Sequence, residues 1–244
     1  LMSEKFSSYT EISVNALQFN PKGQEVLDRK KEILRSISER HGSSPASILF
    51  YGFSPLLLIC DAETIAVTEI SDKIKKYLDD KGIKYTYIEE DKLKDHDKKF
   101  DWVIAVDEYF TFANSEDHQQ GKIARLCALA KKLVVTTLKD YKNQDFRDKE
   151  FSSPLAVRNN KDSKVFLEHH NYDYQDRNSW KTVVYELLGN DANTAGPYNR
   201  RSMFFKQMAK FSIDAGAKEF YVHKNLMYKS LIKKNYEHVI SISF

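Results

Sequence analysis

The chain has few cysteines, few glycines and no long apolar run. Its two cysteines among 244 residues supply neither a disulfide framework nor the ligands of a structural zinc site. The longest apolar run, Pro55 to Cys60, is far shorter than the ~18 residues that a membrane helix needs. The N-terminal stretch Met2–Lys5 lacks the apolar core of a secretory signal. These absences predict a cytoplasmic protein that does not enter a membrane.

The overall composition is that of an ordinary globular protein. Hydrophobic residues make up 41% of the chain and charged residues 30%. A chain of 244 residues is long enough to bury a single large core. No repeat, low-complexity tract or clear linker divides it. We therefore expect one domain over residues 1–244, with an N-terminal helical extension over 1–44 and an insertion over 152–199.

The positive charge is concentrated near the C-terminus. The segment Gly196–Phe244 holds nine lysines and arginines against three acidic residues, although the whole chain carries a net charge of only +3. Such a segment could attract an anionic substrate, RNA included. It is also typical of a solvated, lysine-rich surface. The sequence leaves both interpretations open.

Strands and helices alternate in the first part of the chain. Apolar residues at helical spacing predict a helix over Gly23–Arg40, which ends at a run of turn-forming residues. The expected strands after it are Ser47–Tyr51, Thr64–Thr68, Lys84–Ile88, Asp101–Val106 and Leu133–Thr137. The expected helices between them are Lys73–Lys81, capped by Ser71, and Asp117–Lys131. This alternation indicates a parallel sheet that is covered by helices on both faces.

The second part of the chain has a different pattern. Two β-rich runs predict a long hairpin in the inserted segment, and the residues after them predict a polar loop, a helix and two last strands. The hairpin strands are Val165–Tyr172 and Lys181–Leu187, the loop is Asn190–Pro197, the helix is Arg200–Asp214, and the last strands are Glu219–His223 and Glu237–Phe244.

Two segments carry a resemblance to a known family. Phe100–Phe110 is similar to the fourth strand of class I S-adenosylmethionine-dependent methyltransferases, and Ala215–Phe220 to the turn before their penultimate strand. The order of elements resembles that family over more than half of the chain. The resemblance implies an α/β three-layer sandwich with a mostly parallel sheet, an antiparallel C-terminal reversal and an inserted β-hairpin. It also implies S-adenosylmethionine as cofactor.

Acidic residues at strand ends are the candidate cofactor ligands. Glu69 follows the second expected strand and lies 17 residues after Gly52, close to the spacing that a loop, a helix and a strand need. A carboxylate at this place can accept hydrogen bonds from both hydroxyls of a ribose. Glu90 and Asp91, after the third strand, could meet the adenine amino group. An acid in such a place can also simply start the next helix, where its charge is favourable.

The expected glycine loop is altered. The family has an acid followed by three alternating glycines, which let the backbone approach the cofactor closely. Here Phe50 stands at the position of the acid, and Gly52, Ser54 and Leu56 at those of the glycines. Gly52 and Ser54 are the residues that could still serve the cofactor. The substitutions indicate either a modified cofactor loop or a closed one.

Asp107, Glu108 and Tyr109 are the candidate catalytic residues, because they follow the fourth strand, whose end faces the transferred methyl group in the family. Methyl transfer is an in-line displacement that depends on alignment, and a base is needed only for a protonated nucleophile. Aromatic residues of the hairpin could line an acceptor pocket or simply pack on the sheet. They are Tyr172, Tyr174, Trp180 and Tyr185.

Other chemistries have little support. The histidines are spaced too irregularly for a metal site, and neither a nucleophile elbow nor a phosphate-binding loop is present. The sequence after the fourth strand lacks the prolines of amino-methylating DNA enzymes. The first hypothesis is therefore methyl transfer to a small molecule. The alternatives are an inactive methyltransferase-like binding or scaffold protein and an RNA-directed methyltransferase.

Overall fold

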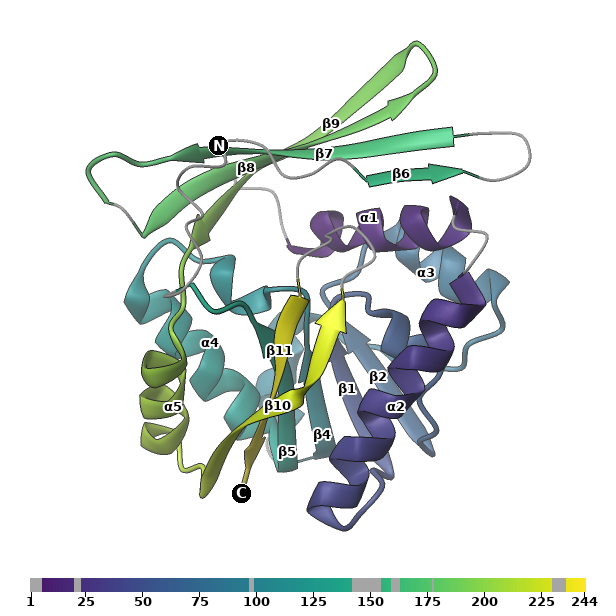
Figure 1. Ribbon diagram of the computed structural model, residues 1–244. Helices are drawn as coiled ribbons and strands as arrows, with labels where there is room; N and C mark the ends of the chain where they lie inside the picture. Colours follow the sequence, from purple (N-terminus) through teal and green to yellow (C-terminus); the bar gives the residue numbers. More distant parts are fainter. Residues whose placement is uncertain are drawn as a thin grey trace.

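The computed structural model describes residues 6–19, 23–96, 99–141, 155–158, 163–176, 178–229 and 236–244. The chain forms a large central sheet with helices on both faces and a second sheet beyond one end of it (Figure 1). This is the α/β three-layer arrangement that the resemblance implies, with the insertion as a separate layer. No helix within the described ranges is long and apolar enough to span a bilayer.

The central sheet has seven strands in the order β10-β11-β5-β4-β1-β2-β3. The strands are β1 (Ser47–Tyr51), β2 (Thr64–Thr68), β3 (Thr86–Tyr87), β4 (Phe100–Ala105), β5 (Ala130–Leu138), β10 (Glu219–Lys229) and β11 (Tyr236–Ser243). β11 lies between β5 and β10 and is antiparallel to both, whereas the pairs among β1 to β5 are parallel. The expected C-terminal reversal is confirmed.

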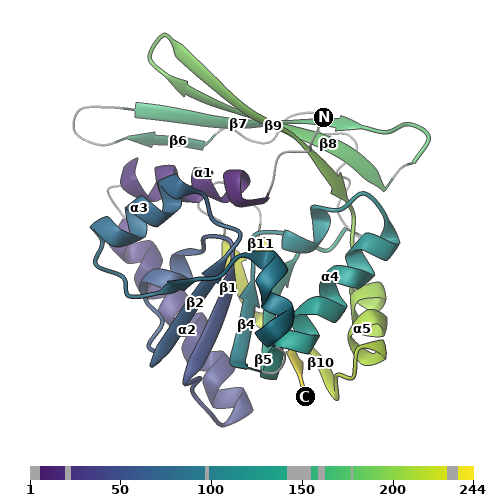
Figure 2. The same ribbon diagram turned by 180° about the vertical axis from the view of Figure 1, so that it is seen from behind.

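Two hydrophobic clusters fill the space on either side of this sheet. Alternate side chains of β1 point to opposite faces, so Ile48 and Phe50 belong to one cluster and Leu49 and Tyr51 to the other. The first cluster includes side chains of α2 (Gly23–His41) and α3 (Asp72–Asp80); the second includes those of α4 (Glu116–Leu129) and α5 (Phe205–Asp214). Figure 2 shows α4 and α5 on the face that lies behind in Figure 1.

The predicted helix and strand positions agree with the structure over β1, β2, β4 and α2 to within a residue or two. The expected cap of α3 is confirmed, since the Oγ of Ser71 accepts a hydrogen bond from the backbone N–H of Ile74. β3 is shorter than the predicted strand, whereas β5 is longer. Element ends are the least certain part of a pattern-based prediction.

The inserted segment forms a four-stranded antiparallel sheet in the order β6-β7-β8-β9, which we call the cover sheet. Its strands are β6 (Leu155–Arg158), β7 (Ser163–Tyr172), β8 (Ser179–Leu188) and β9 (Asp191–Arg201). The predicted hairpin is therefore only its central pair. The predicted loop over Asn190–Pro197 is wrong beyond its first residue: Asn190 lies in a turn, but the residues from Asp191 onward belong to β9, an exposed edge strand that tolerates polar side chains. The predicted helix start at Arg200 is also wrong, because β9 continues through Arg201 and α5 begins at Phe205.

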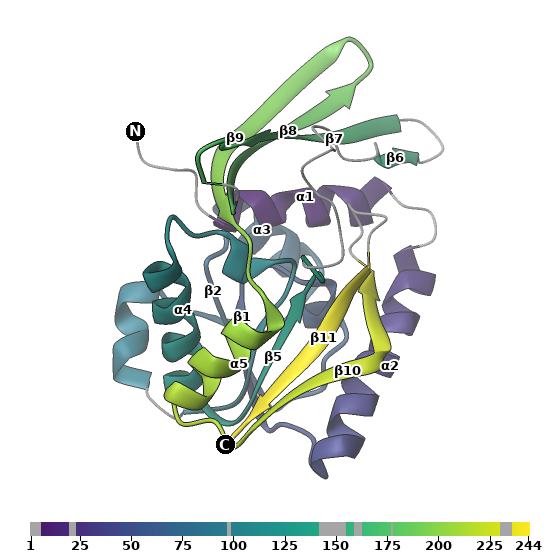
Figure 3. The same cartoon turned by 60° about the vertical axis from the view of Figure 1, so that its left-hand side comes forward.

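Helix α1 (Phe6–Phe19) lies between the cover sheet and the central sheet (Figure 3). The hydroxyl of Tyr9 donates a 2.7 Å hydrogen bond to Glu168 of the cover sheet. Phe6 and Tyr9 also belong to the larger hydrophobic cluster of the central domain. Helix α1 is therefore an internal layer that joins the two sheets above the carboxyl ends of the central strands, whereas α2 covers one face of the central sheet.

Candidate functional site

A cavity of about 660 Å³ opens where the segments after β2, β3 and β4 meet α1 and α4. This volume is within the usual range for sites that hold small ligands, roughly 300 to 1,000 Å³. In an open α/β sheet, ligands bind beyond the carboxyl ends of the strands, where the order of strands reverses. The position and the size of the cavity therefore both indicate a ligand site.

Three of the five predicted cofactor residues line this cavity: Glu69, Glu90 and Asp91. Glu69 follows β2, and the other two begin the 3₁₀ helix η2 (Glu90–His96). We call these three residues the acidic rim. Glu69 has a left-handed backbone, with φ of 53°, which is uncommon outside glycine and is often retained at functional sites.

Helix α4 contributes three basic residues to the same cavity, which we call the α4 basic residues: His118, Lys122 and Arg125. Their spacing of four and three residues places them on one face of the helix. The Nζ of Lys122 donates to the backbone carbonyl of Tyr109 at 3.4 Å, and Arg125 Nη2 donates to that of Glu90 at 2.9 Å. These residues were not predicted as site residues, although their helical spacing in the helix that follows the fourth strand was a signal for them.

Burial lowers the pKa of two of the α4 basic residues. Burial lowers the pKa of Lys122 to about 8, although the nearby Glu69 and Glu90 oppose this change. Burial also lowers the pKa of His118, and the charge of Lys122 adds to the effect. His118 is therefore mainly neutral near pH 7. The cavity thus combines carboxylates, an easily deprotonated amine and a neutral imidazole.

Tyr109 is the only one of the three predicted catalytic residues among the described residues that line the cavity. Its ring packs against Tyr51 below it, at a centroid distance of 5.2 Å, and against Phe6 of α1 at 5.1 Å. Burial raises the pKa of Tyr109 well above its ordinary value. Its hydroxyl is therefore neutral at physiological pH, so Tyr109 offers a hydrogen-bonding group and an apolar ring.

Glu108 lies in a buried ion cluster between β4 and the cover sheet. Its carboxylate is 2.9 Å from Nη2 of Arg200 and 3.1 Å from Nζ of Lys139, and it accepts a 2.5 Å hydrogen bond from the hydroxyl of Tyr141. Only 2% of Glu108 is exposed. Burial would by itself lower the pKa of Arg200, but Glu108 together with Tyr9, Tyr141 and Glu168 more than reverses this effect. Glu108 therefore links β9 and β5 to the end of β4.

Asp107 is buried on the side of α2. The backbones of Asp107 and Glu108 are both left-handed, with φ of 58° and 63°, which turns consecutive side chains to different surroundings. Asp107 interacts electrostatically with Lys30 of α2, whose pKa burial lowers to about 8 against the attraction of Asp107 and Glu237. The structure thus separates the three predicted catalytic residues, and only Tyr109 faces the cavity.

The altered glycine loop is occupied by other parts of the chain. Gly52 has a φ of 75°, and a Cβ placed on it would lie 2.5 Å from Cε1 of Phe6 and 3.0 Å from Cγ2 of Thr10. Ser54 is buried and caps the 3₁₀ helix η1 (Pro55–Leu58), its Oγ accepting from Leu56 N at 3.2 Å. Neither Gly52 nor Ser54 is among the described residues that line the cavity.

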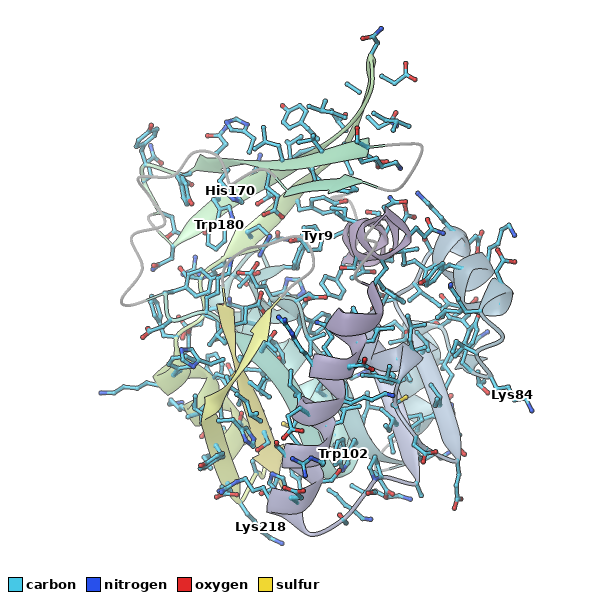
Figure 4. The ribbon with its side chains drawn as sticks, turned by 45° about the vertical axis from the view of Figure 1, so that its right-hand side comes forward. Tyr9, Lys84, Trp102, His170, Trp180 and Lys218 are labelled. Atoms are coloured by element: carbon cyan, nitrogen blue, oxygen red, sulfur yellow. The ribbon has the colours of Figure 1, made fainter. Side chains whose placement is uncertain are left out.

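The aromatic residues of the hairpin have different surroundings, and none of them is among the described residues of the cavity. Trp180 is 9% exposed, and its ring lies 5.5 Å from the Arg200 guanidinium. Tyr174 is 96% exposed. Figure 4 shows Trp180 and Tyr9 between the cover sheet and the central sheet. Asn199 of β9 is the residue that the cover sheet contributes to the cavity.

Three basic residues of the C-terminal segment pair with acidic residues of the chain. Arg200 is buried with Glu108, Arg201 pairs with Asp176 at 2.6 Å, and Lys210 pairs with Asp214 at 2.8 Å. Lys233 and Lys234 lie outside the described residues. Several of these charges thus have acidic partners within the chain. In the ranges that the structure describes, no group of three or more potential metal ligands gathers.

Comparison with known proteins finds similarity at the level of structure. No protein-family profile and no curated protein matches the sequence. The amino pentose methyltransferase CalS10 of Micromonospora echinaspora aligns over 100% of this chain and 99% of its own, with a TM-score of 0.67 and 10% identity. The sugar N-methyltransferase KedS8 of Streptoalloteichus aligns over 100% and 94%, with a TM-score of 0.66 and 10% identity.

A third solved structure, an S-adenosylmethionine-dependent methyltransferase of Clostridium acetobutylicum, aligns over 89% of this chain and 91% of its own. Its TM-score is 0.60 and its identity is 8%. At such low identities the likeness establishes the fold. The α/β architecture of this chain is therefore the methyltransferase-type fold that these structures share.

Proposed function

We propose that this chain, which has the class I methyltransferase fold, binds S-adenosylmethionine and transfers its methyl group to a small-molecule acceptor. The observation that carries the proposal is the acidic rim. Three carboxylates from the ends of β2 and β3 line one cavity of a size suited to a nucleoside and a small acceptor. The fold brings these side chains together beyond the carboxyl ends of the strands, where ligands of such sheets bind.

The residues present fit the adenosyl part of this cofactor. The carboxylate of Glu69 is suited to the two ribose hydroxyls, and Glu90 or Asp91 to the adenine amino group, because each offers acceptors to these donors. The fit is less complete near β1, where Phe6 packs against the turn at Gly52. The amino-acid part of the cofactor would need space close to this turn.

The bound cofactor would supply an electrophilic methyl group, and the protein would supply position and proton acceptance. Asn114 and Asn199 line the cavity and can hydrogen-bond a polar acceptor. The amine of Lys122, whose pKa burial lowers to about 8, lines it as well and in its neutral form can take a proton from an acceptor ammonium. Two structural neighbours are described as an amino pentose and a sugar N-methyltransferase, which makes amino sugars the acceptor class to test first.

Titration of S-adenosylhomocysteine into the purified protein by calorimetry tests the proposal. We expect micromolar binding by the native chain. Glu69→Ala should weaken it about 10- to 100-fold, since a hydrogen bond to a charged group contributes about 1.5 to 3 kcal/mol. Glu89→Ala is the matched control, because Glu89 is exposed and pairs with Lys92 at 2.9 Å. Absence of binding at millimolar concentrations would contradict the proposal.

A second candidate function is a methyltransferase-like binding protein without transfer activity. The position of Phe6 against Gly52 and the capping role of Ser54 favour it, because both place the chain's own groups where a cofactor loop is expected. The same titration separates the two candidates. Binding that depends on Glu69 would support the enzyme, and an acceptor screen with amino sugars would follow.

A further inference from the structure

The turn after β1 is in direct contact with the N-terminal helix. Gly52 has a left-handed backbone, and the space beside its Cα is filled by the ring of Phe6 and the methyl group of Thr10. The backbone N–H of Phe53 donates to Thr10 Oγ1 at 3.3 Å. A glycine at such a turn permits another group to approach the backbone closely. In this chain that group is Phe6.

Phe6 is also part of the cavity. It lines the cavity together with Tyr109 and Phe112, and its ring meets theirs edge-on at centroid distances of 5.1 Å and 5.0 Å. The same side chain therefore borders the open space on one side and covers the Gly52 turn on the other. A ligand that extends from the acidic rim toward β1 meets this ring before it reaches the turn.

Neighbouring residues of α1 hold the ring in place. The Tyr9 hydroxyl donates to Glu168, and its ring lies 4.7 Å from Phe112 and 5.4 Å from Tyr198, measured between centroids. Ser8 and Tyr198 share a 3.1 Å hydrogen bond. Tyr9 is seen between α1 and the cover sheet in Figure 4. Displacement of α1 would break these contacts, so rotation of the Phe6 ring is the smaller change.

We infer that Phe6 is a specificity-determining residue of the cavity. The cavity admits a nucleoside while the Phe6 ring covers the Gly52 turn. It admits a longer adenosyl ligand only when the Phe6 ring leaves that turn. This inference rests on the proposed function. The nucleoside part needs only the acidic rim, whereas an amino-acid extension competes with Phe6 for the surface at Gly52. Only the small fraction of molecules whose turn is uncovered can then bind the longer ligand, so the apparent affinity for that ligand is reduced in proportion to this fraction.

Calorimetric titration of adenosine and S-adenosylhomocysteine into the native chain and Phe6→Ala tests the inference. If the turn is uncovered in ~10% of native molecules, Phe6→Ala strengthens S-adenosylhomocysteine binding ~10-fold. Adenosine binding stays within about twofold, because it does not depend on the turn. Leu17→Ala is the control: Leu17 is a buried α1 residue in the other hydrophobic cluster, and its loss should not favour either ligand.

Unchanged or weaker S-adenosylhomocysteine binding by Phe6→Ala, with adenosine still bound, would overturn the inference and leave the proposed function standing. If neither adenosine nor S-adenosylhomocysteine binds to the native chain or to any variant, both the inference and the proposed function are overturned. An equal gain in affinity for adenosine and S-adenosylhomocysteine in Phe6→Ala would also contradict the inference, since the effect would then not depend on the Gly52 turn.

A measurement without ligand tests the contact itself. Gly52→Ala introduces a methyl group against Phe6, whereas Gly82→Ala introduces one at a similar φ of 69° with no atom within 4 Å. We expect Gly52→Ala to lower Tm more than Gly82→Ala does. Phe6→Ala combined with Gly52→Ala should lower Tm by less than the two single losses together. Additive losses would show that Phe6 does not restrict the space at Gly52 and would overturn the inference.

Discussion

The acidic residues after β2 and β3 differ sharply in their surroundings from the turn after β1 and from the acidic residues after β4. After β2 and β3, the carboxylates of Glu69, Glu90 and Asp91 border open space. After β1 and β4, Gly52 is covered by Phe6, and Glu108 is enclosed by Arg200 and Lys139. Both regions occupy the edge of the sheet where ligands bind. The difference teaches that a strand-end position becomes a site only where no distant segment fills it.

The largest expected effect concerns the enclosed carboxylate. Glu108→Gln removes the anion from between Arg200 and Lys139 and leaves both cations buried without it, so we expect the free energy of unfolding to fall by about 3 to 5 kcal/mol. Urea denaturation measures this loss. Asp176→Asn is the matched control. It removes the carboxylate that pairs with the neighbouring Arg201, and this ion pair is more exposed than that of Glu108 and Arg200. That change should cost at most about 1 kcal/mol.

Equal stability losses in these two variants would contradict the contrast between the regions. In that case Glu108 would be as solvated as Asp176, and it would again be a candidate for proton transfer at the cavity.

The next effect compares two lysines. Burial lowers the pKa of both Lys30 and Lys122 to about 8, so about half of each is neutral at pH 8, against about 0.4% of an ordinary lysine. Only Lys122 lines the cavity, whereas Lys30 is 3% exposed. We expect brief acetylation at pH 8, followed by peptide mass spectrometry, to modify Lys122 well ahead of Lys30.

Saturating adenosine should slow the acetylation of Lys122 and leave that of exposed lysines such as Lys76 unchanged. Rapid modification of Lys30 would show that the α2 side of the sheet also opens to solvent, and the contrast between the two regions would fail.

The smallest effect concerns Ser54. Because its Oγ caps η1, Ser54→Ala should lower the free energy of unfolding by about 1 kcal/mol and leave S-adenosylhomocysteine binding unchanged. Thermal denaturation and calorimetry on the same preparation measure both quantities. Ser71→Ala, which removes the equivalent cap of α3, is the matched control. A clear loss of ligand affinity in Ser54→Ala alone would return Ser54 to the cofactor site.

Much of the central sheet could be predicted because its signals are local. Apolar runs such as Ile48–Tyr51 and the cap at Ser71 reflect contacts within a few residues. The strand-end acids were found for the same reason, since a strand followed by Glu69 is visible in the sequence. β9 was missed because its polar residues resemble a loop, and only pairing with β8 makes them a strand.

The alternation of strands and helices, the acids that follow β2 and β3, and the loss of glycines after Gly52 are all visible in the sequence. The tertiary structure decided which of these positions remain open. Tyr9 meets Glu168 and Glu108 meets Arg200 across 159 and 92 positions of the chain. The physical reason is that burial and ion pairing depend on which segments the fold brings together, and local sequence patterns carry no information about such distant partners.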